Sequence, residues 1–579
     1  MSMARHFLAF VTALSFAAAC APRPAERPPA PVRPPVDVVA EPVRGAHGMV
    51  VSSNGIASEV GAAVLSAGGN AVDAAIATGL ALAVVHPAAG NIGGGGFMVI
   101  RFADGRVTAI DFREKAPIRA HPQMFVNPAT GEYSSETHHD SHLAVGVPGT
   151  VAGFDHAHRR YGSLPWEKLV DPAIALARDG FPLSPGLSRS LRGVLSAMQR
   201  YPASTAVFSK NGVPYEAGEL WRQPDLARTL ERIRMKRRDG FYAGETAELI
   251  VAEMVRGGGM IAPEDLALYQ PRERAPIRGS YRGYDIISMP PPSSGGVALV
   301  QMLNILEGYD LRAMRHNSAP YIHHLIEAMR RAYRDRARFL ADPDFVEVPV
   351  ERLTSKTYAA ELRAQIDPAR ATPSTPADIA SGAESEETTH YSVVDRNGNA
   401  VSVTYTLEAG YGSKIVVPGA GFLLNNEMGD FNARPGLTTE EGLIGTEPNL
   451  ARPEQRMLSS MTPTILARDG KLVAVFGSPG GRTIINTVLQ IVLNIVDHGM
   501  NIQQAVDARR LHHQWLPDRI SIEADGVSEQ TAAQLRAMGH DVRVGGRQGS
   551  VQAIMIDPQS GDRIGAPDRR DADAGARGY

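Results

Sequence analysis

A stretch that is apolar on nearly all sides constrains the fold most strongly. Residues Ala71–Val85 read AVDAAIATGLALAVV, which leaves almost no polar face for water. A surface helix shows a single apolar stripe, so this segment is predicted to be a buried helix, preceded by a shorter helix capped by Ser58. A glycine-rich loop at Asn91–Gly96 then leads to two predicted strands, the first over Phe97–Phe102 and the second ending at Phe112. This mixture of helices and strands indicates the α/β class.

The composition excludes several classes of function. The 579 residues carry 59 Lys and Arg against 62 Asp and Glu, a formal net charge of -3, so the basic surface of a nucleic-acid-binding protein is absent. A single cysteine, Cys20, excludes an intramolecular disulfide, a cysteine-based zinc site and an iron–sulfur cluster. The three His-His pairs are not spaced as ligands on one helical face, so no metal site is expected.

The N-terminus has the layout of an export signal. Residues 1–19 contain an early arginine, an apolar run and then small residues, and they are too short to cross a membrane as a helix. Cys20 stands where a lipoprotein signal would end, while the preceding alanines also fit ordinary cleavage, so lipidation of Cys20 stays open. Residues 20–44 are rich in proline and predict a stiff spacer. We expect an exported protein that is periplasmic, anchored through a lipid on Cys20, or secreted.

The most unusual junction of the chain lies at Thr388. The segment Asp367–Glu387 has three prolines, no aromatic residue and mostly small or acidic side chains, which predicts a mobile loop. Thr388–Val394 follows directly with a strand pattern, and a turn leads to a returning strand over Ala400–Thr406. A polar loop therefore runs straight into a hairpin with the pattern of a buried one.

The segment Gly477–Gly481 and Arg113 can each be interpreted as functional or as structural. Gly477–Gly481 connects a predicted strand to a helix over Thr483–His498, and backbone N–H groups at a helix start favour negative charge. The segment lacks the lysine of a P-loop, so it predicts either an oxyanion hole or a plain packing turn. Arg113, at the end of a strand, could clamp a carboxylate through two parallel bonds or pair with the adjacent Glu114.

Taken together, the motifs closely resemble the γ-glutamyltransferase (glutathione hydrolase) family, in the family's order and over residues 48–579. The segments that carry the resemblance are Gly68–Ala75, Asn91–Phe97, Asp111–Pro117, Val147–Thr150, Pro290–Gly296, Thr388–His390, Leu423–Met428, Leu458–Thr464 and Gly477–Gly481. The resemblance implies an N-terminal-nucleophile hydrolase, a four-layer αββα sandwich made as a precursor that cuts itself. The products would be a large subunit over residues 45–387 and a small catalytic subunit over residues 388–579, which form one folded unit.

The resemblance also implies the catalytic roles. Thr388 would attack the carbonyl of Glu387, and hydrolysis of the resulting ester would free the α-amine of Thr388. That amine, with an ordinary pKa of ~7.7–8, can serve as the base for the threonine hydroxyl. Thr406 would hydrogen-bond the nucleophile, and the backbone N–H groups of Gly480 and Gly481 would stabilise the oxyanion.

The implied substrate is a γ-glutamyl compound such as glutathione, whose acyl group would pass to water or to the amine of an amino acid or peptide. No cofactor is implied. The α-carboxylate would be held by Arg113, Ser459 and Ser460. The α-ammonium would be held by Glu408, Glu427 and Asp430.

Three positions depart from the better-known pattern of the family. Glu408 stands where an asparagine usually contacts the substrate and the nucleophile, which adds negative charge to the ammonium site. Gly429 replaces the first of two adjacent aspartates, and Glu441 stands where some bacterial members carry a lid tyrosine. These changes leave the nucleophile machinery intact and bear on substrate choice.

Two alternatives follow from the same residues. An acylase of the same family would cut glutaryl-type side chains from cephalosporin-like compounds, but such an acyl group has no ammonium for Glu408, Glu427 and Asp430. A non-catalytic exported binding lipoprotein would have no use for Thr388 behind a loop, and its chain would stay uncut.

Overall fold

The computed structural model describes residues 42–376, 388–437, 439–443 and 445–579. The predicted signal peptide, Cys20, most of the proline-rich spacer, the second half of the predicted loop and Glu387 lie outside the described residues.

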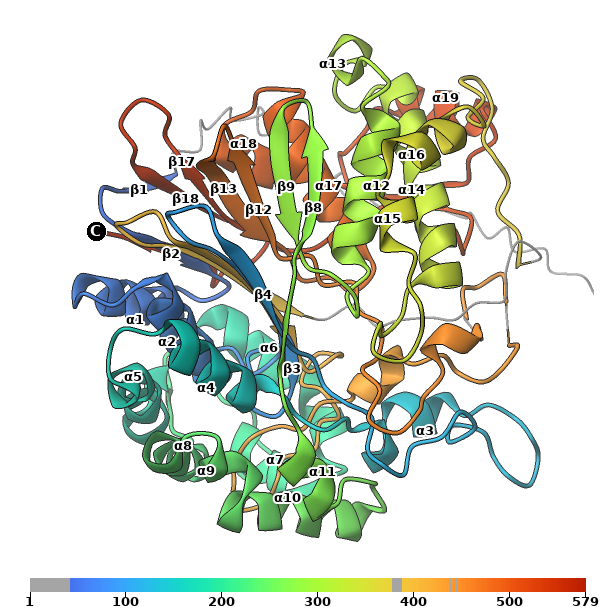
Figure 1. Cartoon of the computed structure of the whole chain (residues 1–579). Helices are drawn as coiled ribbons and strands as arrows, with labels where there is room; N and C mark the ends of the chain where they lie inside the picture. Colours follow the sequence, from blue (N-terminus) through green and yellow to red (C-terminus); the bar gives the residue numbers. More distant parts are fainter. Residues whose placement is uncertain (1–41, 377–387, 438, 444) are drawn as a thin grey trace, which may run out of the picture. The chain divides into compact units, whose positions relative to one another are not determined.

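Two seven-stranded sheets lie face to face at the centre of residues 41–579 (Figure 1). All neighbouring strands in them run antiparallel, and β10 and β11 of the second sheet contact β13 and β17 of the first. The first sheet has the order β1 (Val43–Gly45), β18 (Arg563–Pro567), β17 (Gln552–Ile556), β13 (Lys471–Gly477), β12 (Thr464–Arg468), β9 (Tyr284–Ser288), β8 (Ile277–Tyr281). The second has the order β19 (Gly575–Gly578), β2 (Met49–Ser52), β10 (Thr389–Val394), β11 (Ala400–Thr406), β3 (Gly95–Arg101), β4 (Val107–Phe112), β7 (Arg272–Arg274).

Helices cover the outer face of each sheet. On the first sheet lie α12 (Gly295–Leu306) and α17 (Thr483–Val496), with α14 (Ala319–Phe339) against α12. On the second lie α1 (Gly55–Ser66), α2 (Ala71–Val85) and α4 (Thr150–Tyr161), with α5 (Trp166–Asp179) behind α2. The structure therefore has the four αββα layers that the resemblance implied. Across the described residues, no helix combines the length and the apolar character needed to cross a membrane.

The remaining elements are shorter or peripheral. The helices are α3 (Ser135–His139), α6 (Pro185–Met198), α7 (Pro202–Phe208), α8 (Pro224–Lys236), α9 (Asp239–Tyr242), α10 (Gly244–Gly257), α11 (Pro263–Leu268), α13 (Leu311–Met314), α15 (Val350–Leu353), α16 (Lys356–Arg363), α18 (Ile502–Asp507), α19 (Glu529–Ala537) and the 3-10 turns η1 (His142–Ala144), η3 (Glu427–Asp430) and η4 (Glu447–Asn449). The strands are β5 (Phe181–Pro182), β6 (Leu220–Trp221), β14 (Leu511–His512), β15 (Ile520–Ile522) and β16 (Val542–Val544).

The prediction of a buried helix is confirmed, and both oxygens of its one carboxylate, Asp73, accept hydrogen bonds. Every residue of α2 is buried. Asn70 caps the helix by accepting from the N–H of Val72 and of Asp73, and the Asp73 carboxylate accepts the N–H of Asn70 (3.0 Å). The second oxygen of Asp73 accepts the N–H of Ser163 (3.0 Å), so the buried charge is hydrogen-bonded on both sides.

The predicted cap of the preceding helix is wrong. Helix α1 begins at Gly55, where Asn54 caps it by accepting the N–H of Ile56 (2.9 Å). Ser58 is buried one turn later, and its hydroxyl donates to the carbonyl of Gly575 (2.7 Å) in the last strand. Asparagine and serine are equally good caps, so cap preference does not choose between Asn54 and Ser58. The bond of Ser58 to Gly575, far along the chain, decides it.

Candidate active site

The Thr388 hairpin occupies the middle of the second sheet. Strand β10 begins at Thr389, and its pairing places Thr389 opposite Tyr405 of β11. Thr388 and Thr406 therefore lie at the same end of the hairpin. The Thr406 carbonyl accepts the side-chain amide of Asn91 (2.8 Å), so the glycine-rich loop supports this end of β11.

A small cavity brings most of the predicted site residues together. It is lined by Arg113, Thr388, Thr406, Glu408, Glu427, Asp430, Ser459, Ser460, Met461, Gly481 and Ile484. These residues come from six separate parts of the sequence: the end of β4, the start of β10, the end of β11, the turn η3, the loop before β12, and the segment from the end of β13 into α17. Nine of the ten predicted catalytic and substrate-binding residues are among them.

The tenth, Gly480, lines a second and larger cavity of about 900 Å³, together with Thr388. Gly480 and Gly481 thus belong to one turn but face different cavities, and Thr388 lines both. Glu441, by contrast, is exposed and lines neither cavity. The arrangement lets a group in the small cavity and a group in the large one meet at Thr388.

Arg113 is the buried cation of the small cavity. Its guanidinium contacts Glu427 and Asp430, and it lies 3.8 Å from Glu114. The sequence left a local pair with Glu114 open for Arg113. In the structure that contact is the longest of the three, and Glu427 and Asp430 lie closer to the guanidinium. Burial lowers the pKa of Arg113, but these three carboxylates outweigh burial and hold it above its ordinary value. Arg113 therefore stays charged at any working pH.

Burial shifts two of the carboxylates near Arg113, those of Glu114 and Glu427, toward their protonated form. Burial raises the pKa of Glu114 to about 7, against the opposing charge of Arg113. Burial also raises the pKa of Glu427 well above its ordinary value. Among the described residues, one oxygen of Glu427 and one of Glu408 have no hydrogen-bond partner. Buried acceptors of this kind suit a ligand that brings N–H donors.

The turn Gly477–Gly481 joins β13 to α17, as predicted. The helix ends at Val496, two residues before the predicted end at His498, and β13 begins at Lys471. Gly480 has a φ of +126°, and a Cβ there would be 2.5 Å from Oγ1 of Thr483. The Thr483 hydroxyl donates to the Gly480 carbonyl (2.7 Å), which orients this peptide. Glycine is therefore required at the turn by its backbone angle and by the space available.

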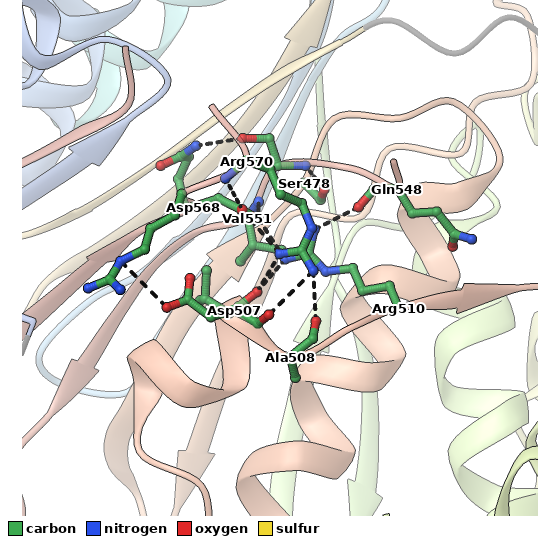
Figure 2. Close-up of polar contacts among 12 residues, drawn as sticks. Ser478, Asp507, Ala508, Arg510, Gln548, Val551, Asp568 and Arg570 are labelled. Carbon is green, nitrogen blue, oxygen red and sulfur yellow. Dashed lines mark hydrogen bonds and ion pairs between the residues drawn. The ribbon is translucent and has the colours of Figure 1, made fainter. Parts of the chain in front are cut away.

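A network of buried charges and hydrogen bonds connects this turn to the C-terminal part of the chain (Figure 2). The Ser478 hydroxyl accepts the N–H of Ser550 (3.0 Å), and the next residue, Val551, donates its N–H to Asp568 (2.7 Å). Asp568 also accepts from Arg510 (2.6 Å) and pairs with Arg570 (3.2 Å). Burial raises the pKa of Asp568, but the two arginines outweigh burial and lower it. The aspartate thus keeps its charge and ties the turn to the C-terminal strands.

Sequence reasoning missed this network. Ser478 was visible only as part of a glycine-rich turn, and Arg510, Asp568 and Arg570 stand in no recognisable motif. The available signal was weak: two arginines and an aspartate in the C-terminal region, without a recognisable spacing. Across the described residues, no group of three or more His, Cys, Asp or Glu side chains could hold a metal ion.

Comparison with known proteins identifies the family. The family model described as gamma-glutamyltranspeptidase matches residues 57–578. The chain is 48% identical over 559 residues to the glutathione hydrolase proenzyme of Escherichia coli (strain K12), covering 95% of this chain and 96% of the relative. It is 38% identical over 538 residues to the acylase ACY 1 proenzyme of Pseudomonas sp. (strain SE83), covering 92% and 94%.

A solved structure agrees over nearly the whole length. The cephalosporin acylase from Bacillus halodurans superposes with a TM-score of 0.82 at 28% identity, covering 96% of this chain and 99% of that one. The match of the family model to nearly all of the folded part, with relatives close to half identical, has one reading: this chain belongs to the gamma-glutamyltranspeptidase family.

Proposed function

We propose that this chain is a self-cleaving γ-glutamyltransferase and glutathione hydrolase whose nucleophile is Thr388. The observation that carries the proposal is the position of Thr388 at the meeting point of two cavities, one of them lined by Arg113 and three carboxylates. A zwitterionic α-amino acid end needs one cation and several acceptors, and the small cavity has both.

The first step is the cut before Thr388. The Thr388 hydroxyl attacks the Glu387 carbonyl, the peptide C–N bond breaks, and the acyl group moves to the hydroxyl oxygen as an ester. Water then hydrolyses the ester, which leaves a carboxylate on Glu387 and a free α-amine on Thr388. That amine takes the hydroxyl proton in each later turnover, because a neutral hydroxyl is a weak nucleophile by itself.

In each turnover the γ-glutamyl end would lie in the small cavity. Arg113, Ser459 and Ser460 hold its α-carboxylate. Glu408, Glu427 and Asp430 hold its α-ammonium. The γ-carbonyl then lies against Thr388, and the leaving amine extends into the larger cavity, where water or an acceptor amine replaces it. The acyl-enzyme ester on Thr388 is broken by that second nucleophile, which restores the threonine.

The two cleavage products would stay together as a heterodimer. Strands from both sides of the cut pair with one another in each sheet: β10 pairs with β2 and β11 with β3, while β12 pairs with β9. Separating residues 45–387 from residues 388–579 would break these ladders and expose the core between the sheets. The leader sequence supports export of the protein, with Cys20 as the candidate lipid anchor.

Gly480→Ala is expected to lower kcat for γ-glutamyl transfer by about 10²–10³-fold, the usual loss when one oxyanion donor is misplaced. The added methyl group meets Thr483 at 2.5 Å and the φ of +126° strains alanine, so the Gly480 peptide must turn. Steady-state kinetics on the matured enzyme measure the loss. Gly470→Ala is the matched control, because Gly470 also has a positive φ (72°) but has no neighbour within 4 Å of its Cβ position. Equal kinetics in the Gly480 variant and the control would remove the oxyanion role.

The competing acylase function is separated by paired substrates. A glutaryl group lacks the ammonium and would leave the unpartnered oxygens of Glu408 and Glu427 without an N–H donor in a buried pocket. We expect the protein to hydrolyse a γ-glutamyl anilide about 10²-fold better than the glutaryl anilide in kcat/KM, because an unpaired buried charge costs about 2–5 kcal/mol. A glutaryl anilide that reacts as well or better would make the acylase the correct assignment.

A further inference from the structure

His139 is the imidazole that faces the acidic side of the small cavity. It ends α3, and its Nδ1 atom lies 3.7 Å from Oε1 of Glu408. The adjacent His138 is engaged elsewhere, with its Nδ1 on the Tyr133 hydroxyl (2.9 Å) and its Nε2 on the Met428 carbonyl (3.1 Å). The two imidazole rings are in contact, with centroids 4.4 Å apart and planes tilted by 40°, so His138 limits the space open to His139.

Glu408 is anchored through its backbone to the hairpin that carries Thr388, and one of its carboxylate oxygens has no hydrogen-bond donor among the described residues. Its N–H donates to the Thr406 hydroxyl (2.9 Å), and its Oε2 accepts the side-chain amide of Asn426. Its Oε1 has no hydrogen-bond donor among the described residues, although Glu408 is only 3% exposed. The backbone φ of Glu408 is +81°, a region that favours glycine or asparagine, so this carboxylate stands where a smaller residue would fit with less strain.

The space that His139 occupies exists because residue 429 is glycine. A Cβ at Gly429 would lie 2.5 Å from Nδ1 of His139 and 3.1 Å from Oε1 of Glu408. Any side chain at this position would therefore push the imidazole away from the carboxylate. The two departures from the family pattern, Glu408 and Gly429, act on the same contact.

We propose that His139 is a positioning residue which, by pairing with Glu408, sets how strongly the small cavity discriminates between acyl groups with and without an α-ammonium. The inference rests on the proposed function. Protonated His139 neutralises Glu408, so the cavity tolerates an acyl group that brings no cation. Neutral His139 leaves Glu408 as a buried charge whose best partner is the ammonium of the substrate. The preference for γ-glutamyl over glutaryl groups therefore rises as His139 loses its proton.

The charges around His139 favour its protonated form. Burial lowers its pKa, but the contact with Glu408 and the charges of Glu408, Asp430 and Asp140 outweigh burial and raise the pKa above its ordinary value. A histidine with a raised pKa is charged at lower pH and loses its proton as the pH rises through that value. Burial lowers the pKa of the neighbouring His138, which therefore stays neutral throughout.

Other ionisable groups also lie at or beside the cavity. Arg113 stays charged, while burial raises the pKa of Glu114 to about 7 and that of Glu427 well above its ordinary value. The cut would also create an α-amine on Thr388, and the ordinary pKa of such a group is ~7.7–8. The amine serves both substrates equally, so it cancels in a ratio of the two rates. The glutamates remain when His139 is replaced, so a comparison with that variant isolates the imidazole.

The test is the ratio of kcat/KM for a γ-glutamyl anilide to kcat/KM for a glutaryl anilide, measured from about pH 5.5 to about pH 8.5. In the unmodified enzyme we expect the ratio to rise about tenfold across this range, the effect of removing one charge near a partly buried site. In His139→Asn we expect the ratio to be high and about tenfold less dependent on pH. His121→Asn, which removes an exposed histidine, is the matched control and should follow the unmodified enzyme.

Two further variants keep the result decisive. Gly429→Ala should displace the imidazole and flatten the pH profile as His139→Asn does, which guards against a variant that fails to mature. In a Glu408→Gln background, His139→Asn should have no further effect, since the carboxylate through which it acts is gone. Appearance of the Thr388 fragment serves as the readout of folding in each variant.

The outcomes separate the two proposals. A ratio with the same pH profile in the unmodified enzyme, His139→Asn and Gly429→Ala would overturn the role of His139 and leave the proposed function standing. Absence of γ-glutamyl hydrolysis in the unmodified enzyme at every pH would overturn the proposed function itself, and the present inference with it.

Discussion

Thr388→Ala is expected to leave a single uncut chain, whereas the unmodified protein yields a fragment of 192 residues that begins at Thr388 (579 − 388 + 1). Alanine has no hydroxyl to attack the preceding carbonyl, so neither the ester nor the free α-amine can form. Because every later turnover needs both groups, γ-glutamyl hydrolysis should fall to the background rate. Intact mass measured under denaturing conditions gives the first result, and anilide hydrolysis gives the second.

Thr389→Val is the matched control for this experiment. Thr389 is the next residue along the chain, and its hydroxyl contacts Ser53 (3.0 Å) at the base of the hairpin. Valine keeps the shape and the β preference of threonine, so the variant should still cut itself. A fragment beginning at residue 388 in the alanine variant would show that another group performs the cut. A single uncut chain in the unmodified protein after prolonged incubation would favour the non-catalytic binding protein.

Arg113→Lys is expected to reduce kcat/KM for γ-glutamyl anilides by about 10²-fold, since lysine keeps the charge but loses a hydrogen bond between charged groups, which costs about 1.5–3 kcal/mol. The planar guanidinium reaches Glu427 and Asp430 at once, and a single ammonium cannot reproduce this fork. The loss should appear mainly in KM, because in the proposed complex the arginine holds the substrate carboxylate rather than the reacting carbonyl. Kinetics on the matured variant measure both constants.

Arg101→Lys provides the comparison for this change. Arg101 is also buried, but its guanidinium donates to the carbonyls of Phe102 (3.3 Å) and Gly470 (2.5 Å), outside both cavities. Its replacement should lower stability and leave KM unchanged. If the two variants raise KM equally, the effect belongs to general loss of packing and Arg113 is not the carboxylate clamp.

Local patterns in the sequence were enough for the parts of the fold that repeat over a few residues. The apolar run of α2 predicted a buried helix with the correct bounds, Ala71–Val85, and the returning strand over Ala400–Thr406 was also predicted to the residue. Both depend on side-chain periodicity along one segment, which the order of residues specifies directly. The motif resemblance supplied the αββα layers and the family, which periodicity alone could not.

The details that decide chemistry came from the tertiary structure. Arg113 could have paired with its neighbour Glu114, yet its closest contacts are Glu427 and Asp430. His139 appeared as one of several histidine pairs, and its position against Glu408 depends on a glycine from a third segment.

The same holds for the supports of the site. Asn54 rather than Ser58 caps α1 because Ser58 bonds the last strand, and Asp568 supports the Ser478 turn through Val551 and Ser550. By itself, then, the sequence predicted the main elements, the family and a set of candidate site residues, because each is written in a short stretch of chain. Only the tertiary structure decided which charges meet, because the packing of two sheets and their helices brings together partners that are hundreds of residues apart. The pairing of a buried charge also depends on all its neighbours at once.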